Sequence, residues 1–266
     1  MKSPANTSGG AHVIVFHRTV APEKLTPQER DDLSRQLYEV HCRIFSGVSA
    51  EAFRRHVIEP DAERTVIQTF LATDGRIVGY CAVHRFRRRV RGRNVLVLRA
   101  EAGLLPEYRG RGMTYGFGIV FSIVEKFKHP FTPIYYLGTL VHTSSYHLFC
   151  KYFRKIFPSP DTAATEDVES IALELIESFP DPAVEKTDPF IRDVGWTTIE
   201  TPQEKELNQR KDRPDVAFFK NRNPGYTLGH GLVVLVPMTF SNVFGALMTR
   251  CVEVAAQTVT RHQPEI

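Results

Sequence analysis

The residues best suited to chemistry lie in one short loop, Tyr108-Arg109-Gly110-Arg111-Gly112-Met113-Thr114. Glycines carry no Cβ, so a backbone of this kind can approach an anion closely and point successive N–H groups at its oxygens. The start of a helix directly after the loop would add unpaired N–H groups and a partial positive charge, and the arginines add formal charge. The pattern predicts a pyrophosphate-binding loop; the alternative is a surface turn with solvated arginines.

The segments around this loop predict the elements that hold it. β-Branched and aromatic runs bounded by turn residues indicate strands, and apolar residues at three- and four-residue spacing indicate helices. Pro106 ends the strand before the loop, and Thr26-Pro27 begins the first helix. The strands are predicted over 12–20, 65–72, 76–86, 94–105 and 134–141, and the helices over 27–45, 50–58, 111–128 and 143–156. The arginine-rich stretch between the third and fourth of these strands is predicted to be a loop.

The remaining third of the chain has a different composition. Prolines and an acidic helix over 165–178 predict an insertion or lid over 158–212. The segment 213–266 is predicted to supply C-terminal strands, at 216–220 and 231–237, and a closing helix at 241–259. We therefore expect a flexible tail over 1–11 and a single α/β domain over 12–266, with a mixed central sheet flanked by helices.

Composition limits the class of protein. With 42% hydrophobic residues and a net charge of +4 over 266 residues, the chain is neither disordered nor a polycation. Its four cysteines follow no CxxC or Cys/His spacing, so neither a disulfide framework nor a metal site is expected. The longest apolar run, at 232–237, is too short to span a bilayer, and no signal peptide is visible at the N-terminus. We expect a cytoplasmic protein.

The loop resembles motif A of the GNAT (N-acetyltransferase) superfamily, Arg/Gln-x-x-Gly-x-Gly/Ala, which Pro-Glu-Tyr often precedes. Arg109 stands at its first position and Gly112 at its fourth, while Thr114 replaces the usual Gly or Ala at the sixth. The helix after the next strand is similar to motif B: Tyr152 and Phe157 fall on the family's Tyr and Phe. The similarity covers roughly residues 65–157.

This resemblance implies a GNAT fold and direct attack of an amine on an acyl thioester carried by acetyl-CoA or a longer acyl-CoA. It implies Tyr152 as the acid that protonates the leaving thiolate; the alternative is a tyrosine that only packs on its helix. Ser145 stands where motif B usually has Asn. The residues expected to bind the donor are Leu104, Leu105, Arg109, Gly110, Arg111, Gly112, Met113, Thr114 and Ser145.

An acidic side chain in the middle of an apolar strand is the candidate base. Glu101 lies between Ala100 and Ala102, five residues before Pro106, and either faces a polar cleft or pairs with an arginine at the surface. Among the histidines, His84 and His142 lie on or beside predicted strands. No histidine pairs with Ser and Asp, or with Cys, in a way that predicts a covalent nucleophile.

A run of arginines is the strongest local charge feature: Arg85, Arg87, Arg88, Arg89, Arg91 and Arg93. Such a run is usually a solvated connection. It could instead receive an acidic acyl-carrier protein or nucleic acid phosphates, although nucleic acid is disfavoured because aromatic residues are sparse within the run.

Three functions therefore remain open. The first is an acyl-CoA-dependent N-acyltransferase with a small-molecule or peptide amine acceptor. The second is a long-chain N-acyltransferase that uses fatty acyl-CoA or an acyl-carrier protein, since larger members of the superfamily carry comparable insertions. The third is a non-catalytic GNAT-like module that binds CoA or a protein partner.

Overall fold

A seven-stranded sheet forms the centre of the computed structural model, which describes residues 14–110, 112–161, 166–184, 188–209 and 213–261. The tail predicted over 1–11 lies outside these residues. The strands are β1 (Ile14–Val20), β2 (Phe45–Ser46), β3 (Arg64–Ala72), β4 (Ile77–Val90), β5 (Arg93–Leu104), β6 (Ile134–Leu140), β7 (Ile191–Asp193), β8 (Thr197–Thr198) and β9 (His230–Pro237). The helices are α1 (Pro27–Ile44), α2 (Ala50–Phe53), α3 (Met113–Lys128), α4 (Thr143–Tyr152), α5 (Glu166–Glu177), α6 (Pro202–Gln209), α7 (Pro214–Arg222) and α8 (Phe240–Arg261).

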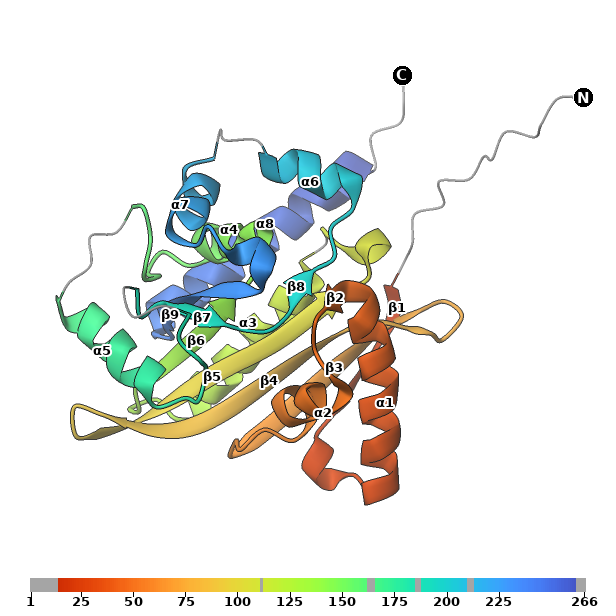
Figure 1. Cartoon of the computed structure of the whole chain (residues 1–266), viewed down its shortest axis with the longest axis horizontal. Helices are drawn as coiled ribbons and strands as arrows, with labels where there is room; N and C mark the ends of the chain where they lie inside the picture. The colour runs from red at the N-terminus through yellow and green to blue at the C-terminus, as the bar shows by residue number, and fades with distance from the viewer. Residues whose placement is uncertain (1–13, 111, 162–165, 185–187, 210–212, 262–266) are drawn as a thin grey trace, which may run out of the picture.

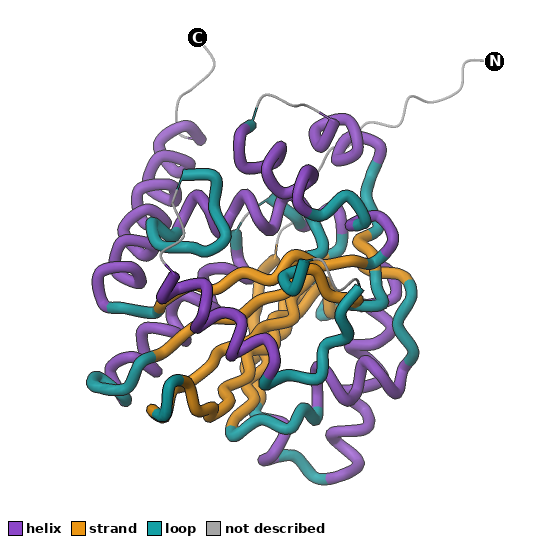
Figure 2. The backbone as a smooth tube through the Cα atoms, turned by 60° about the vertical axis from the view of Figure 1, so that its left-hand side comes forward, coloured by secondary structure: helices purple, strands orange, loops and turns teal. Residues whose placement is uncertain are grey.

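The strand order of the large sheet is β1-β3-β4-β5-β6-β9-β7, and β2 pairs with β8 separately. Neighbours in the large sheet are antiparallel except β5 and β6, which are parallel because α3 connects them across one face. Figure 1 shows α1, α2 and α5 in front of this sheet and α3 behind it, and Figure 2 shows helices on both sides of the strands. The predicted class, a mixed α/β sheet flanked by helices, is confirmed.

The parallel strands β5 and β6 separate soon after they begin to pair. Their register covers three pairs, from Leu96↔Ile134 to Leu98↔Tyr136, and extends no further among the described residues. β6 instead continues along β9, from Tyr135↔Pro237 to Leu140↔Leu232. The second half of β5 thus has a neighbour on one side only, where β4 pairs with it as far as Leu104. This divergence places the end of β5 and the loop after it at an opening of the sheet.

The helix α1 shows how local sequence sets an element that packs on this sheet. Thr26 forms a capping box with Glu29: its hydroxyl accepts from the Glu29 N–H at 3.3 Å, and the Glu29 carboxylate accepts from the Thr26 N–H at 2.9 Å. Pro27 occupies the first helical position, where no N–H is needed. Leu37, fully buried, and Ile44 lie on the face that packs against the sheet.

Two predicted elements are wrong. The arginine-rich stretch is not a loop: β4 runs to Val90 and β5 starts at Arg93, so only Arg91 and Gly92 form the turn, both with positive φ. The segment predicted as a strand at 216–220 lies in the helix α7, because Pro214 begins a helix and its apolar residues Val216 and Phe219 face the core at helical spacing.

The segment 158–212 packs into the molecule along much of its described length. The helix α5 buries Ala172 and Leu175 completely, and β7 forms the edge of the large sheet beside β9. Within 188–209, Thr197 and Thr198 of β8 pair with β2 at the end of α1. The segment therefore forms part of the core and joins the N-terminal helices to the C-terminal strands.

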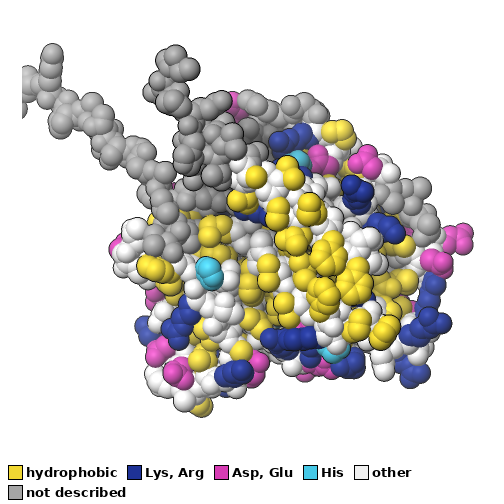
Figure 3. All heavy atoms as spheres, turned by 180° about the vertical axis from the view of Figure 1, so that it is seen from behind, with side chains coloured by type: hydrophobic (Ala, Val, Ile, Leu, Met, Phe, Trp, Pro, Cys, Tyr) yellow, Lys and Arg dark blue, Asp and Glu magenta, His cyan; other side chains and the backbone are white. Residues whose placement is uncertain are grey.

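The helix α8 lies against α3 behind the sheet. The Phe127 ring of α3 lies 5.5 Å from that of Phe240 and 6.2 Å from that of Phe244. Figure 3 shows apolar side chains gathered on this side of the molecule; the exposed ones on the two helices are Val120, Val124, Phe127, Phe240, Phe244, Met248, Val252 and Val254. These ring contacts hold the start of α8 against the end of α3, and Arg250, further along α8, lies beside Gly112 at the start of α3.

Candidate active site

The loop between β5 and α3 has the backbone that its glycines predict. Gly110 and Gly112 have φ values of +81° and +60°, in the region that side chains disfavour. Gly112 is the residue that precedes α3, so the N–H groups of Met113 and Thr114 lie in a first turn, which has no intrahelical acceptors for them. Nothing lies within 4 Å of the position that a Cβ on Gly110 would take. These groups could together hold an anion; Arg111 lies outside the described residues.

The side chain of Arg109 turns back toward the protein. Its Nε donates to the carbonyl of Leu104 at 3.0 Å, and its Nη1 donates to the carbonyl of Ile199 at 3.0 Å. The same Nη1 lies 2.8 Å from the carboxylate of Glu204 in α6. Arg109 therefore fastens the loop to the segment that follows β8.

A second cation approaches the loop from α8. The guanidinium of Arg250 lies 3.0 Å from the position of a Cβ on Gly112, so the absence of a side chain there permits the approach. Arg250 also lies 3.5 Å from Glu253. Sequence analysis missed Arg250 because it is distant in the chain and belongs to no motif.

In the second half of β5, alternate residues direct their backbone N–H and C=O groups toward the side where no described strand is paired. The N–H of Leu96 donates to Pro133 on the β6 side, whereas that of Leu105 donates to Val78 next to β4. Residues of a strand alternate in the direction of their polar groups, so Ala100 and Ala102 direct theirs toward the side that β6 has left. These two residues, rather than Leu105, present backbone groups to the opening. The carbonyl of Leu104 faces the same side and accepts from Arg109.

Glu101 lies next to His84 across β4 and β5. The His84 Nε2 is 2.7 Å from the Glu101 Oε2, yet the two atoms are out of line for a hydrogen bond, and both are buried without another partner. Thr65 bonds the other ring nitrogen of His84 at 3.0 Å. Burial, followed by the charge of Glu101, raises the pKa of Tyr136, so this carboxylate lies near the phenol on β6. Buried polar atoms without partners are rare and often mark functional positions.

Tyr152 is buried on α4 and directed toward α8. Its hydroxyl donates to the Glu253 carboxylate at 2.5 Å, and Lys151 pairs with the same carboxylate. Burial, followed by the bond to Glu253, raises the pKa of Tyr152, so the phenol keeps its proton at neutral pH. It is thus a hydrogen donor close to Arg250 and the loop.

Ser145 is connected to the first turn of α3 through its backbone. The Tyr115 hydroxyl donates to the Ser145 carbonyl at 3.1 Å, and the Tyr115 ring lies 5.6 Å from that of Tyr152. The structure thus brings α3, α4 and α8 together beside the loop. Glu101 lies on the sheet next to His84, whereas the hydroxyl of Tyr152 is bonded to Glu253 of α8.

No protein-family model matches the sequence, and no curated protein matches it. Solved structures do match. A probable N-acyltransferase of unknown function from Enterococcus faecalis has 13% identity and a TM-score of 0.35, covering 52% of this chain and 33% of that one. A GNAT family N-acetyltransferase from Escherichia coli in complex with CoA has 14% identity and a TM-score of 0.30, covering 51% and 67%. NAA60 from Arabidopsis thaliana in complex with acetyl-CoA has 11% identity and a TM-score of 0.31, covering 53% and 87%.

At these scores and identities a match says nothing about activity or substrate, and only a third of the Enterococcus chain is spanned. The element order of the present chain is the stronger observation, because strand, glycine loop, helix and parallel strand follow one another as the sequence resemblance implies. The fold is GNAT-like.

In this GNAT-like fold the arginine run is largely paired within the chain. Arg85 lies 2.7 Å from the buried carboxylate of Glu125, and Arg87 lies 2.7 Å from Glu63. Arg91 pairs with Asp167 at 2.8 Å, and Arg88 stacks on Phe86 and Phe179. This internal pairing argues against the interpretation of the run as a docking surface for an acidic carrier protein.

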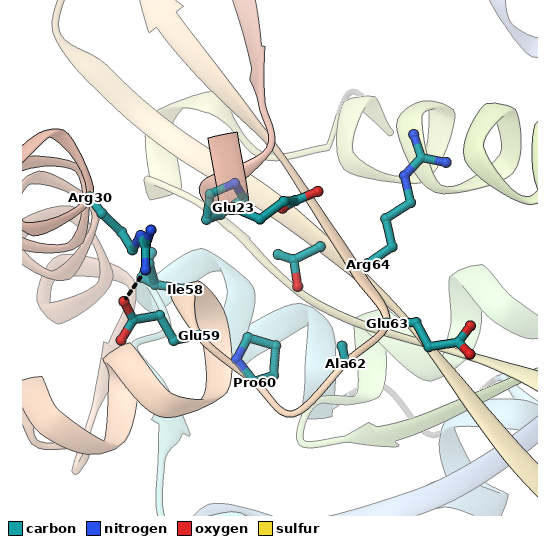
Figure 4. A pocket seen from close by; sticks show the side chains of 10 residues that line it. Glu23, Arg30, Ile58, Glu59, Pro60, Ala62, Glu63 and Arg64 are labelled. Carbon is teal, nitrogen blue, oxygen red and sulfur yellow. Dashed lines mark hydrogen bonds and ion pairs between the residues drawn. The ribbon is translucent and has the colours of Figure 1, made fainter. Parts of the chain in front are cut away.

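A small pocket of about 150 Å³ lies away from the loop. Figure 4 shows it between the start of β3, the end of the π-helical turn at 54–58 and the residues before α1, with the Arg30–Glu59 ion pair at its edge. Arg30 and Glu59 pair with each other there, while Arg64 pairs with Glu125 and Glu63 with Arg87, both outside the pocket. Across the described ranges no helix is long and apolar enough to cross a bilayer, and no cluster of metal-ligating side chains occurs.

Proposed function

We propose that this protein transfers an acyl group from an acyl-CoA to an amine by direct attack. The observation that carries the proposal is the divergence of β5 and β6 beside a glycine loop that leads into α3. A pantetheine arm laid in this opening would meet the backbone groups of Ala100 and Ala102, while the pyrophosphate would meet the N–H groups of the loop and of the α3 start.

In this proposal Glu101 accepts the proton of the amine. Its carboxylate lies on the sheet near the opening, and His84 beside it can share or relay the proton. The side chain of Glu101 is 17% exposed, so an acceptor or a water can reach it. Tyr152 is the proposed donor to the leaving thiolate, since its raised pKa keeps it protonated.

A pair of glycine variants tests the donor site. Gly110 and Gly75 have nearly the same φ, +81° and +80°, and neither would meet another atom with an added Cβ. An alanine at either position therefore introduces the same backbone strain, about 1–2 kcal/mol. Only Gly110 lies in the loop; Gly75 lies in the turn between β3 and β4.

We expect acyl-CoA to raise the melting temperature of the wild type and of Gly75→Ala, and to lose most of this effect in Gly110→Ala. The two variants without ligand should melt at similar temperatures. The rate of acyl transfer to an amine, measured by the release of the free CoA thiol, should fall in Gly110→Ala in parallel with the loss of stabilisation. Equal stabilisation of both variants by CoA would place the donor elsewhere.

A comparison of acyl-CoAs in the same assay tests how long an acyl group the protein binds. A melting temperature that rises from acetyl-CoA to palmitoyl-CoA would favour the long-chain alternative, whereas a response equal to that of CoA itself would indicate that the acyl group contributes little. Binding without transfer to any amine would favour the non-catalytic module.

A further inference from the structure

His142, Ser144 and Glu200 form a hydrogen-bonded chain at the start of α4. The Ser144 Oγ lies 2.7 Å from the His142 Nδ1, and the His142 Nε2 lies 2.8 Å from the Glu200 Oε1. His142 is 6% exposed, whereas Ser144 is exposed. The sequence showed no histidine paired with Ser and Asp, or with Cys, and gave no sign of this arrangement, because Glu200 comes from a segment far along the chain.

The hydrogen bonds determine which ring nitrogen carries the proton. The backbone N–H of Ser144 donates to the His142 Nδ1 at 3.2 Å, so Nδ1 holds a lone pair and the proton is on Nε2. Nε2–H can then donate to Glu200. This is the protonation state in which an imidazole can remove a proton from the serine hydroxyl while a carboxylate stabilises the resulting cation.

Backbone hydrogen bonds hold both His142 and the segment that carries Glu200. The His142 carbonyl accepts from the N–H groups of Ser145 and Tyr146 at 3.1 and 3.2 Å, which fixes His142 before the helix. Ile199, next to Glu200, donates to the Ile44 carbonyl at 2.9 Å and accepts from Arg109 at 3.0 Å. The relative positions of the acid and the imidazole thus depend on backbone contacts on both sides.

We propose that Ser144 is a nucleophile that takes an acyl group from an activated ester or thioester and passes it to water. The Ser144 Oγ forms a bond to the carbonyl carbon as its proton moves to the His142 Nδ1. The C–O or C–S bond then breaks, and Nδ1 returns the proton to the leaving alkoxide or thiolate. Water then attacks the acyl carbon as Nδ1 takes its proton. The Ser144 Oγ–C bond breaks, Nδ1 returns the proton to Oγ, and the carboxylic acid leaves.

The geometry also supplies a donor for the charge that develops on the carbonyl oxygen. When Nδ1 becomes protonated, the N–H of Ser144 loses its acceptor and is free to bond that oxygen. The N-terminal end of α4, a helix of 10 residues, adds a partial positive charge at the same place. Ser144 and His142 would be catalytic residues, and Glu200 a positioning residue.

The test uses the full chain, a fluorophosphonate probe and p-nitrophenyl acetate, so it does not depend on CoA. We expect a single phosphonyl adduct on Ser144 by peptide mass spectrometry, and its loss in Ser144→Ala. Ser241→Ala is the matched control: Ser241 is also exposed and is the second residue of its helix, but bonds Thr239 at 3.1 Å instead of a histidine. It should be labelled like the wild type.

His142→Asn separates catalysis from folding, because Asn caps a helix well but is no base. We expect it to keep the wild-type melting temperature and to lower ester hydrolysis and labelling by about 100-fold or more. Glu200→Gln should lower the kcat of ester hydrolysis and leave its KM nearly unchanged, since the imidazolium loses the carboxylate that stabilises it. Failure of the probe to label Ser144, or equal labelling in His142→Asn, would overturn the proposal. Stabilisation by acyl-CoA should persist in Ser144→Ala, which separates this proposal from the transferase one.

Discussion

Removing the guanidinium of Arg109 tests whether this side chain holds the loop or binds phosphate. Arg109→Ala loses hydrogen bonds to the carbonyls of Leu104 and Ile199 and an ion pair with Glu204. Each neutral acceptor contributes about 0.5–1 kcal/mol and the charged one about 1.5–2 kcal/mol at this partial exposure, so the free energy of unfolding should fall by about 3 kcal/mol. For a domain of this size that is a decrease of about 6–12 °C in Tm.

The assay combines urea unfolding with titration of CoA at two salt concentrations. Because phosphate contacts come from the backbone in this interpretation, the CoA affinity should fall by about tenfold at most and keep its dependence on salt. Arg35→Ala is the control, since Arg35 is exposed and pairs with Asp32 of the same helix, α1. It should leave both unfolding and CoA affinity unchanged.

The opposite result would refute the reasoning. If Arg109→Ala unfolds like the wild type, loses CoA binding and loses its salt dependence, then the guanidinium leaves Glu204 and binds the pyrophosphate directly. The assignment of Arg109 from the motif would then hold for its side chain as well as for its backbone.

Two further predictions concern buried charge. Glu125 is fully buried between two guanidinium groups 2.7 Å away, so Glu125→Gln should lower the free energy of unfolding by about 3 kcal/mol in urea, while Glu51→Gln, at an exposed ion pair, should leave the unfolding midpoint unchanged. Burial lowers the pKa of His41 from 6.5 to about 4, so the unfolded chain binds the extra proton between these pH values. Stability should therefore be complete above pH 6.5 and fall by about 2–3 kcal/mol as the pH decreases to about 4. His41→Gln should flatten this pH dependence, and an unchanged slope in that variant would assign it to other groups.

Much of the fold could be predicted because its sequence signals lie within the elements that they specify. The strands from 65 to 105, the glycine loop and α3 all follow from periodicity, Pro106 and the two glycines. The end of β4 was missed because charged residues normally indicate a loop; here Glu125 and Glu63 neutralise arginines of that strand. The strand predicted at 216–220 was wrong because two adjacent phenylalanines look β-like, whereas Pro214 begins a helix.

The candidate site was less predictable where it depends on contacts distant in sequence. Glu101 could be singled out as an acid in an apolar strand, but its neighbour His84 became visible only when β4 paired with β5. Arg250 and Glu200 carry no local signal at all. Their positions depend on α8 packing against α3 and on β8 pairing with β2.

The pairing of β6 with β9 has a consequence for synthesis on the ribosome. Leu140 must find Leu232, which emerges much later, so a nascent chain that already contains β6 lacks the strand that completes its hydrogen bonds. During that interval β6 is an apolar edge strand, and edge strands recruit other chains. Elongation speed through the segment between these strands, and chaperones that cover strand edges, should therefore affect the yield of folded protein more than changes within β3 to β5, whose partners follow one another directly.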